Sequence, residues 1–165
     1  MNLRNIVCML FILLVVNSSV VAEIIDVGTG DNTAGLYVEW KDGFSVEFAV
    51  NFDTPSLTGW ELLDAVKGET TLETVVEDFG WGDFIDGIIY EGHSNIGYGG
   101  DADWWHYWIM NAPSTDWVSP AYGIADRTLY DGDVDGWVYG RDTIPEPCTL
   151  ILMAFGGLVL RRKMV

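Results

Sequence analysis

The sequence predicts a small α+β domain in which one short helix packs against a mostly antiparallel β-sheet. Three observations lead to this fold class: two alternating apolar runs meet at an Asp-Gly turn, a short amphipathic segment follows them, and further β-rich segments come after it. A hairpin, a helix and then more strands, in this order, are typical of the α+β class. No internal repeat is evident in the chain.

The predicted hairpin joins residues 36–40 to residues 44–52 across Lys41-Asp42-Gly43. An Asp-Gly pair between two alternating runs is a strong hairpin signal. In the second run one face is apolar and carries Phe44, Val46, Phe48, Val50 and Phe52. The other face carries Ser45, Glu47, Ala49 and Asn51. We therefore expect a half-buried strand with one face against a core.

The predicted helix begins after residues 54–58, which supply Thr, Pro and Ser side chains suited to a helix start. Trp60, Leu63 and Val66 then fall on one helical face, and Gly68 marks the end. Beyond the helix, β-branched and aromatic residues predict further strands. These strands cover residues 70–79, 84–90, 104–109 and 136–140, with a turn at Gly80 and Gly82 and a flexible glycine-rich loop at 92–100.

A signal peptide is predicted at the N-terminus. Arg4 precedes an apolar run over residues 6–16, and polar and small residues lead to Ala22, where we expect cleavage before Glu23. An uncleaved anchor would need about 20 apolar residues. The chain therefore divides into a signal peptide (1–22), an exported domain (23–143) and a C-terminal tail (144–165).

The exported domain is strongly acidic and rich in tryptophan. It carries 24 acidic residues against four basic ones, which makes nucleic acid an improbable partner. All eight tryptophans lie within it, and a disordered acidic chain lacks such residues, so we expect a packed domain. Cys8 should leave with the signal peptide, and Cys148 alone cannot form an intramolecular disulfide.

The C-terminal tail has three consecutive parts. Pro145-Glu146-Pro147 is followed by an apolar stretch over residues 150–160 and then by Arg161-Arg162-Lys163. This order resembles the PEP-CTERM sorting signal of Gram-negative-type bacteria. The resemblance implies removal near the Pro-Glu-Pro motif by an exosortase, a membrane-embedded cysteine peptidase. Cys148 follows that motif where a small residue such as Ser or Ala is common, which leaves the fate of its thiol open.

The length of the apolar stretch favours a sorting signal that is removed over a permanent membrane anchor. Residues 149–160 would form about 18 Å of helix, against about 30 Å of hydrocarbon. The terminal basic cluster should stay on the cytoplasmic side after the Sec translocon has exported the domain. We therefore expect transient inner-membrane association, followed by the cell surface or the extracellular space. A short apolar helix packed in the core is the alternative.

The exported domain is similar to the transcobalamin C-terminal-like domain. The residues that carry this similarity are in segments 59–66, 82–88, 104–108 and 131–133. The resemblance implies a β-grasp-like fold with a single crossing helix. In cobalamin carriers this domain forms one lid of a two-domain site with a helical barrel. The chain shows no such barrel, so cobalamin binding and its ligand residues do not follow.

An acidic segment near the end of the domain matches the opening of a calcium-binding EF-hand loop. Asp131, Asp133 and Asp135 alternate, Trp137 stands at the seventh position and Asp142 at the twelfth. Alternating carboxylates can converge on a hard cation. However, Pro145 and Pro147 prevent the helix that should follow such a loop, so a solvated turn before a strand is the competing interpretation.

The densest aromatic run offers a candidate ligand face. Strand alternation places Trp104, His106 and Trp108 on one side, where they could bind a small ligand or a glycan or else fill the core. No nucleophile elbow, metal-ligand set or phosphate loop indicates an enzyme. The sequence therefore predicts a non-catalytic exported protein among exopolysaccharides or other envelope components. A binding module is the alternative, and a calcium-dependent surface protein or hydrolase is third.

Overall fold

The computed structural model describes residues 24–80, 82–101 and 103–141. These residues belong to one unit that spans Glu23–Glu146. The predicted signal peptide, the sorting motif with its basic cluster, and Asp142 lie outside the described residues.

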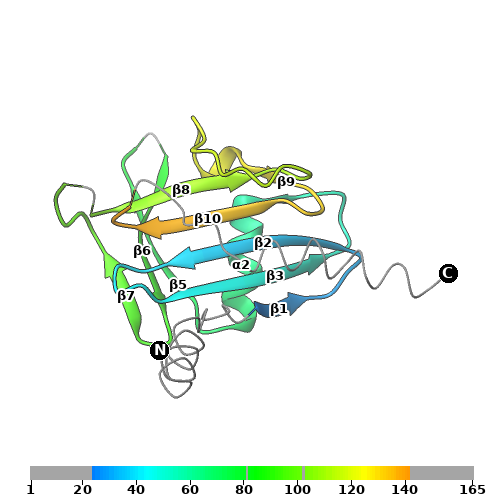
Figure 1. Ribbon diagram of the computed structural model, residues 1–165, viewed down its shortest axis with the longest axis horizontal. Helices are drawn as coiled ribbons and strands as arrows, with labels where there is room; N and C mark the ends of the chain where they lie inside the picture. The colour runs from blue at the N-terminus through cyan, green and yellow to red at the C-terminus, as the bar shows by residue number, and fades with distance from the viewer. Residues whose placement is uncertain (1–23, 81, 102, 142–165) are drawn as a thin grey trace, which may run out of the picture. The chain divides into compact units, whose positions relative to one another are not determined.

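The main sheet has five strands in the order β1-β3-β2-β10-β8 (Figure 1). Its strands are β1 (Ile24–Gly28), β2 (Asn32–Glu39), β3 (Ser45–Phe52), β8 (Trp105–Met110) and β10 (Val134–Tyr139). β2 and β3 form the antiparallel hairpin, while β1 pairs parallel to β3 and β10 pairs parallel to β2. β8 pairs antiparallel to β10 and forms one edge of the sheet.

Two smaller sheets complete the β-structure of the described residues. The small sheet contains three antiparallel strands in the order β5-β6-β7. They are β5 (Glu73–Asp78), β6 (Asp83–Tyr90) and β7 (His93–Ile96). A short pair joins β4 (Leu57–Thr58) to β9 (Thr128–Leu129), and a 3₁₀ turn, η1 (Ile124–Asp126), precedes β9.

The helix α2 (Gly59–Glu69) lies where the sequence predicts it and packs against the main sheet (Figure 1). Thr58 is its N-cap, and Thr58 and Glu61 form a reciprocal capping box that satisfies two backbone N–H groups. Leu62, Leu63 and Val66 are buried beneath it, whereas Trp60 is only half-buried. The helix therefore contacts the sheet through a face slightly rotated from the predicted one.

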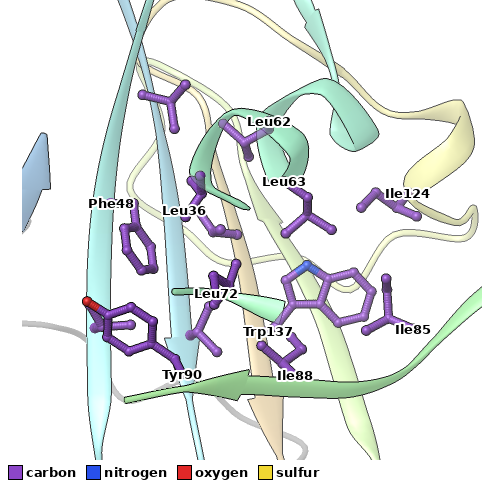
Figure 2. Close-up of a cluster of buried hydrophobic side chains, with 14 of the residues drawn as sticks. Leu36, Phe48, Leu62, Leu63, Leu72, Ile85, Ile88, Tyr90, Ile124 and Trp137 are labelled. Atoms are coloured by element: carbon purple, nitrogen blue, oxygen red, sulfur yellow. The ribbon is translucent and has the colours of Figure 1, made fainter. Parts of the chain in front are cut away.

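The core lies between α2, the main sheet and the small sheet. Figure 2 shows Leu62 and Leu63 of the helix above Leu36, with Ile88 of β6 below Trp137 and Ile85 beside it. Its most buried members include Leu36, Phe48, Leu62, Leu63, Ile85 and Ile88. The indole Nε1 of Trp40 donates to the carbonyl oxygen of Ile88 at 2.9 Å, which ties the hairpin to the small sheet.

The α+β class, the hairpin, the helix and the strands after it are confirmed. Strand pairing is mostly antiparallel, as expected, and the main sheet is mixed because it contains two parallel pairings. Two expectations need correction. The glycine-rich segment holds strand β7 as well as loop. β3 is also buried on both faces: Glu47 is 3% exposed, and its register partner Tyr37 packs against Trp117, so the segment after β8 helps to cover the second face.

Candidate functional site

The aromatic run lies on the edge strand of the main sheet, and its faces are those the sequence predicts. Trp105, Tyr107 and Ile109 pair with β10 positions on the core side, whereas His106 and Trp108 lie on the other side. This arrangement follows from β-strand alternation.

Three rings stack in a row beside this edge. The centroids of Trp104 and His106 are 4.6 Å apart with an interplanar angle of 27°, and those of Tyr98 and Trp104 are 5.6 Å apart at 27°. We call Tyr98, Trp104 and His106 the aromatic ladder. Trp104 and His106 are half-buried, while Tyr98 is 69% exposed. The ladder is therefore neither sealed in the core nor scattered over the surface.

Two adjoining hollows, which we call the edge cleft, run between the edge of the main sheet and the small sheet. The first holds about 480 Å³ and is lined by residues of β5 and β6 and by Tyr98 and Trp104 of the aromatic ladder. The second holds about 260 Å³ and extends past His106 toward the segment 119–124. Both are lined by Phe84, Ile85, Trp104 and Trp105. The larger volume falls within the range of about 300–1,000 Å³ that is usual for ligand pockets.

Trp108 does not line the edge cleft, although it shares a strand face with His106. The predicted trio is thus divided: Trp104 and His106 belong to the cleft and Trp108 does not. Residues that the sequence reasoning did not single out complete the walls. They are Phe79 and Phe84 from the small sheet, Tyr98 from the glycine-rich segment and Tyr122 from the segment before η1.

The edge cleft gathers much of the exposed aromatic surface of the described residues. Eight large hydrophobic side chains are exposed among the described residues. Four of them line the cleft, namely Phe79, Phe84, Tyr98 and Tyr122. An exposed apolar concentration rimmed by polar groups marks a binding site more often than single exposed residues do. The surface therefore favours this cleft as the place where the domain contacts a ligand.

Carboxylates stand among these rings. Glu77 lies directly opposite Phe84 across the β5–β6 pair, and Asp86, at the irregularity of this pairing, lines the first hollow together with them. Asp83 lines the second hollow. No Lys or Arg of the described residues lines either hollow. The edge cleft is consequently both aromatic and electronegative.

The cations of the described residues are paired with carboxylates elsewhere. Lys41 pairs with Asp103, and Lys67 pairs with Asp64. Arg127 pairs with Asp135 and also lies 3.5 Å from Asp133, and Arg141 pairs with Glu39. The negative charge at the cleft is therefore not neutralised by a neighbouring lysine or arginine of its lining.

The backbone of β8 also contributes to the cleft. Ile109 exchanges both of its backbone hydrogen bonds with Val118, so its N–H and C=O point away from β10. By strand alternation, the same groups of Trp105 and Tyr107 also point away from β10, on the side of the second hollow. Backbone donors and acceptors thus accompany the rings along this edge.

A buried polar network supports the second hollow. Tyr107 donates its hydroxyl hydrogen to Asp135 at 2.6 Å, and the Nε of Arg127 donates to the other oxygen of Asp135 at 2.9 Å. Arg127 also donates to the side chain of Asn111 at 2.7 Å. Burial raises the pKa of Tyr107, and the negative charge of Asp135 raises it further. Tyr107 stacks on Trp137 at 4.6 Å, so two lining rings are held in place.

The acidic segment gives its carboxylates to protein partners. Asp131 accepts from the backbone N–H of Thr33, and Asp133 accepts from the N–H groups of Ala112 and Tyr130. Asp135 pairs with Arg127 inside the domain. Within the described ranges no group of three or more His, Cys, Asp or Glu side chains is placed to hold a metal ion.

Trp137 lies in β10 rather than in a loop, with its ring in the core. The geometry of the acidic segment is thus that of a turn leading into a strand.

The second histidine occupies a different place. The His93 ring stacks on Phe44 with centroids 3.8 Å apart, and its Nδ1 lies 2.6 Å from a carboxylate oxygen of Asp42. The backbone N–H of Phe44 and the His93 ring lower the pKa of that carboxyl. This contact fastens the hairpin turn to β7.

No protein-family model matches the chain, and no curated protein matches it. In the part of the chain that the structure describes, no helix has both the length and the apolar character needed to cross a membrane.

Proposed function

We propose that this chain is an exported, non-catalytic surface protein whose domain binds a glycan in the edge cleft. The observation that carries this proposal is the aromatic ladder. Tyr98, Trp104 and His106 present stacked rings along a cleft of ligand size, and rings of this kind pack against the apolar faces of sugars while their polar edges stay wet.

Export and sorting rest on the sequence. The signal peptide, the Pro145-Glu146-Pro147 motif, the short apolar stretch and the Arg161-Arg162-Lys163 cluster support passage through the Sec translocon and processing by an exosortase. The tail associates with the inner membrane until it is removed, and the domain then works at the cell surface or in the extracellular matrix. Mass spectrometry of the mature protein from its native host tests this step. Persistence of residues 150–165 on most molecules contradicts it.

The β-grasp-like assignment belongs to the same proposal. A mixed sheet with one helix packed against it supports it, as does the similarity to the transcobalamin C-terminal-like domain. A fold of this kind does not determine its ligand. The glycan assignment therefore depends on the cleft and not on the resemblance.

Binding is tested with an exposed pair of tyrosines. Tyr98 lies in the cleft and Tyr130 outside it, and both are exposed, at 69% and 59%. The purified protein is screened on immobilised glycans, and the affinity of each hit is measured for the parent, Tyr98→Ala, Trp104→Ala and Tyr130→Ala. We expect roughly a tenfold loss for the two cleft variants, equal to about 1.4 kcal/mol, and no change for Tyr130→Ala. Absence of binding to every glycan contradicts the proposal.

A further inference from the structure

We infer that the ligand of the edge cleft is a cationic glycan, an amino-sugar chain whose free amines are protonated. This inference rests on the proposed glycan-binding function and names its substrate class. It follows from the juxtaposition of aromatic rings and unneutralised carboxylates in one cleft.

The first step is the sign of the charge. Glu77, Asp83 and Asp86 line the hollows, and no lysine or arginine of the described residues joins them. A uronate, sulfated or phosphorylated glycan would bring negative charge against these groups. Like charges placed together cost free energy, so the cleft excludes anionic sugars. A protonated amine instead gains from each carboxylate that it approaches.

The second step is the placement of charge beside rings. Glu77 stands across the strand pair from Phe84, and Asp86 lines the same hollow as these two residues. The substituents of a sugar ring packed on Phe84 would therefore lie close to the carboxylates of Glu77 and Asp86. An ammonium group beside Tyr98, the exposed ring at the end of the ladder, would also be attracted by that ring.

The third step concerns the length of the ligand. Carboxylates occur in both hollows, with Glu77 and Asp86 in the first and Asp83 in the second. The two hollows adjoin through Phe84 and Trp104. A single cationic sugar would engage only one hollow. A chain with an amine on successive units places positive charge in both, so an oligomer fits better than a monomer.

The fourth step is the field of the whole protein. The chain has a formal net charge of -17, which attracts polycations from a distance. This long-range attraction is screened above about 0.1 M salt, where the Debye length is about 10 Å. Contacts inside the cleft are screened less. If the protein still prefers the free-amine form over the acetylated form at physiological salt, that preference would therefore come from contacts inside the cleft.

The experiment compares two oligomers of equal length, one with free amines that are protonated and one with acetylated amines that carry no charge. The full-chain protein is titrated by calorimetry with a glucosamine oligomer and with its N-acetylated counterpart of the same length, at a pH below the pKa of the sugar amine. We expect at least tenfold tighter binding of the free-amine oligomer at physiological salt. Equal affinity, or tighter binding of the acetylated oligomer, overturns the inference and leaves the proposed function intact. Binding of neither oligomer nor of any other glycan overturns both.

Matched variants assign the preference to the cleft. The double variant Glu77→Gln/Asp86→Asn removes two cleft carboxylates, whereas Asp31→Asn/Asp53→Asn removes two exposed carboxylates outside it. We expect the first to lose most of the preference and the second to keep it. Equal losses in the two would mean that the general surface charge attracts the oligomer, which contradicts the inference. Asp83→Asn is the second cleft variant should the double variant fail to fold, and it must lose part of the preference.

Discussion

Arg127 and Asp135 form an ion pair in the interior of the domain, with the Arg127 Nε 2.9 Å from the Asp135 Oδ1 and side chains only 3% and 1% exposed. Arg127 directly precedes β9, and Asp135 lies on β10 in the main sheet. The pair therefore fastens the long connection between β8 and β10 to the sheet. Because part of that connection lines the second hollow, the pair also supports the edge cleft.

Removing the arginine should be strongly destabilising. Burial works against a charge on both partners, and the pKa of Asp135 is raised by burial although Tyr107 and Arg127 oppose the shift. Arg127→Met leaves Asp135 buried without its counter-ion, and such a loss costs about 3–5 kcal/mol. Urea unfolding followed by tryptophan fluorescence measures the change. Lys67→Ala, which breaks the exposed helix pair with Asp64, should cost no more than about 0.5 kcal/mol.

The helix start gives a second prediction. Thr58→Ala removes the side chain that accepts from the backbone N–H of Glu61, and the free energy of unfolding should fall by about 1 kcal/mol. Thr58→Ser keeps the hydroxyl and should stay close to the parent. Equal stability of the alanine and serine variants in urea unfolding would contradict the assigned cap.

Glu47 predicts a pH dependence. Its carboxyl is buried, one of its oxygens has no hydrogen-bond partner among the described residues, and burial raises its pKa from the ordinary 4.5. The resulting stabilisation is fully present below pH 4.5 and is lost as the pH rises through the raised folded-state pKa. At neutral pH the charged form therefore destabilises the fold.

The test is Glu47→Gln, which cannot ionise. It should raise the free energy of unfolding at pH 7, and its advantage over the parent should shrink as the pH falls through the raised folded-state pKa of Glu47 toward 4.5. The exposed substitution Glu73→Gln serves as the control. If Glu47→Gln is no more stable than the parent at pH 7, burial of the ionised Glu47 carboxylate does not destabilise the fold.

Calcium should leave the domain unchanged. Asp131, Asp133 and Asp135 already accept hydrogen bonds or an ion pair from protein groups, so calcium would have to compete with these partners for the carboxylates. Thermal unfolding with millimolar calcium and with a chelator should give the same midpoint. A calcium-dependent rise in the midpoint would restore the EF-hand hypothesis.

Local signals in the sequence suffice for much of the fold. Asp42-Gly43 with alternating neighbours determines the hairpin, and Thr58 before an amphipathic segment determines the helix start. Both depend on residues close together along the chain. The parallel pairing of β2 with β10 joins residues about a hundred positions apart, and no local pattern encodes it.

The candidate site was only partly predictable for the same reason. Trp104 and His106 stand out in the sequence because they alternate within an aromatic run. Phe84, Glu77 and Asp86 come to the cleft from the small sheet, and their approach to Trp104 depends on tertiary packing. The β-rich composition of residues 84–90 indicates a strand but not what that strand faces.

The most direct test of the edge cleft follows individual indole signals during ligand addition. In a nitrogen–proton NMR spectrum, a glucosamine oligomer should shift the Nε1–H signal of Trp104, which lines the cleft, and leave that of Trp40, which is 1% exposed and bonded to Ile88. Saturable shifts at Trp104 without shifts at Trp40 are the predicted result. Binding that leaves the Trp104 signal unmoved would place the ligand elsewhere and contradict the account.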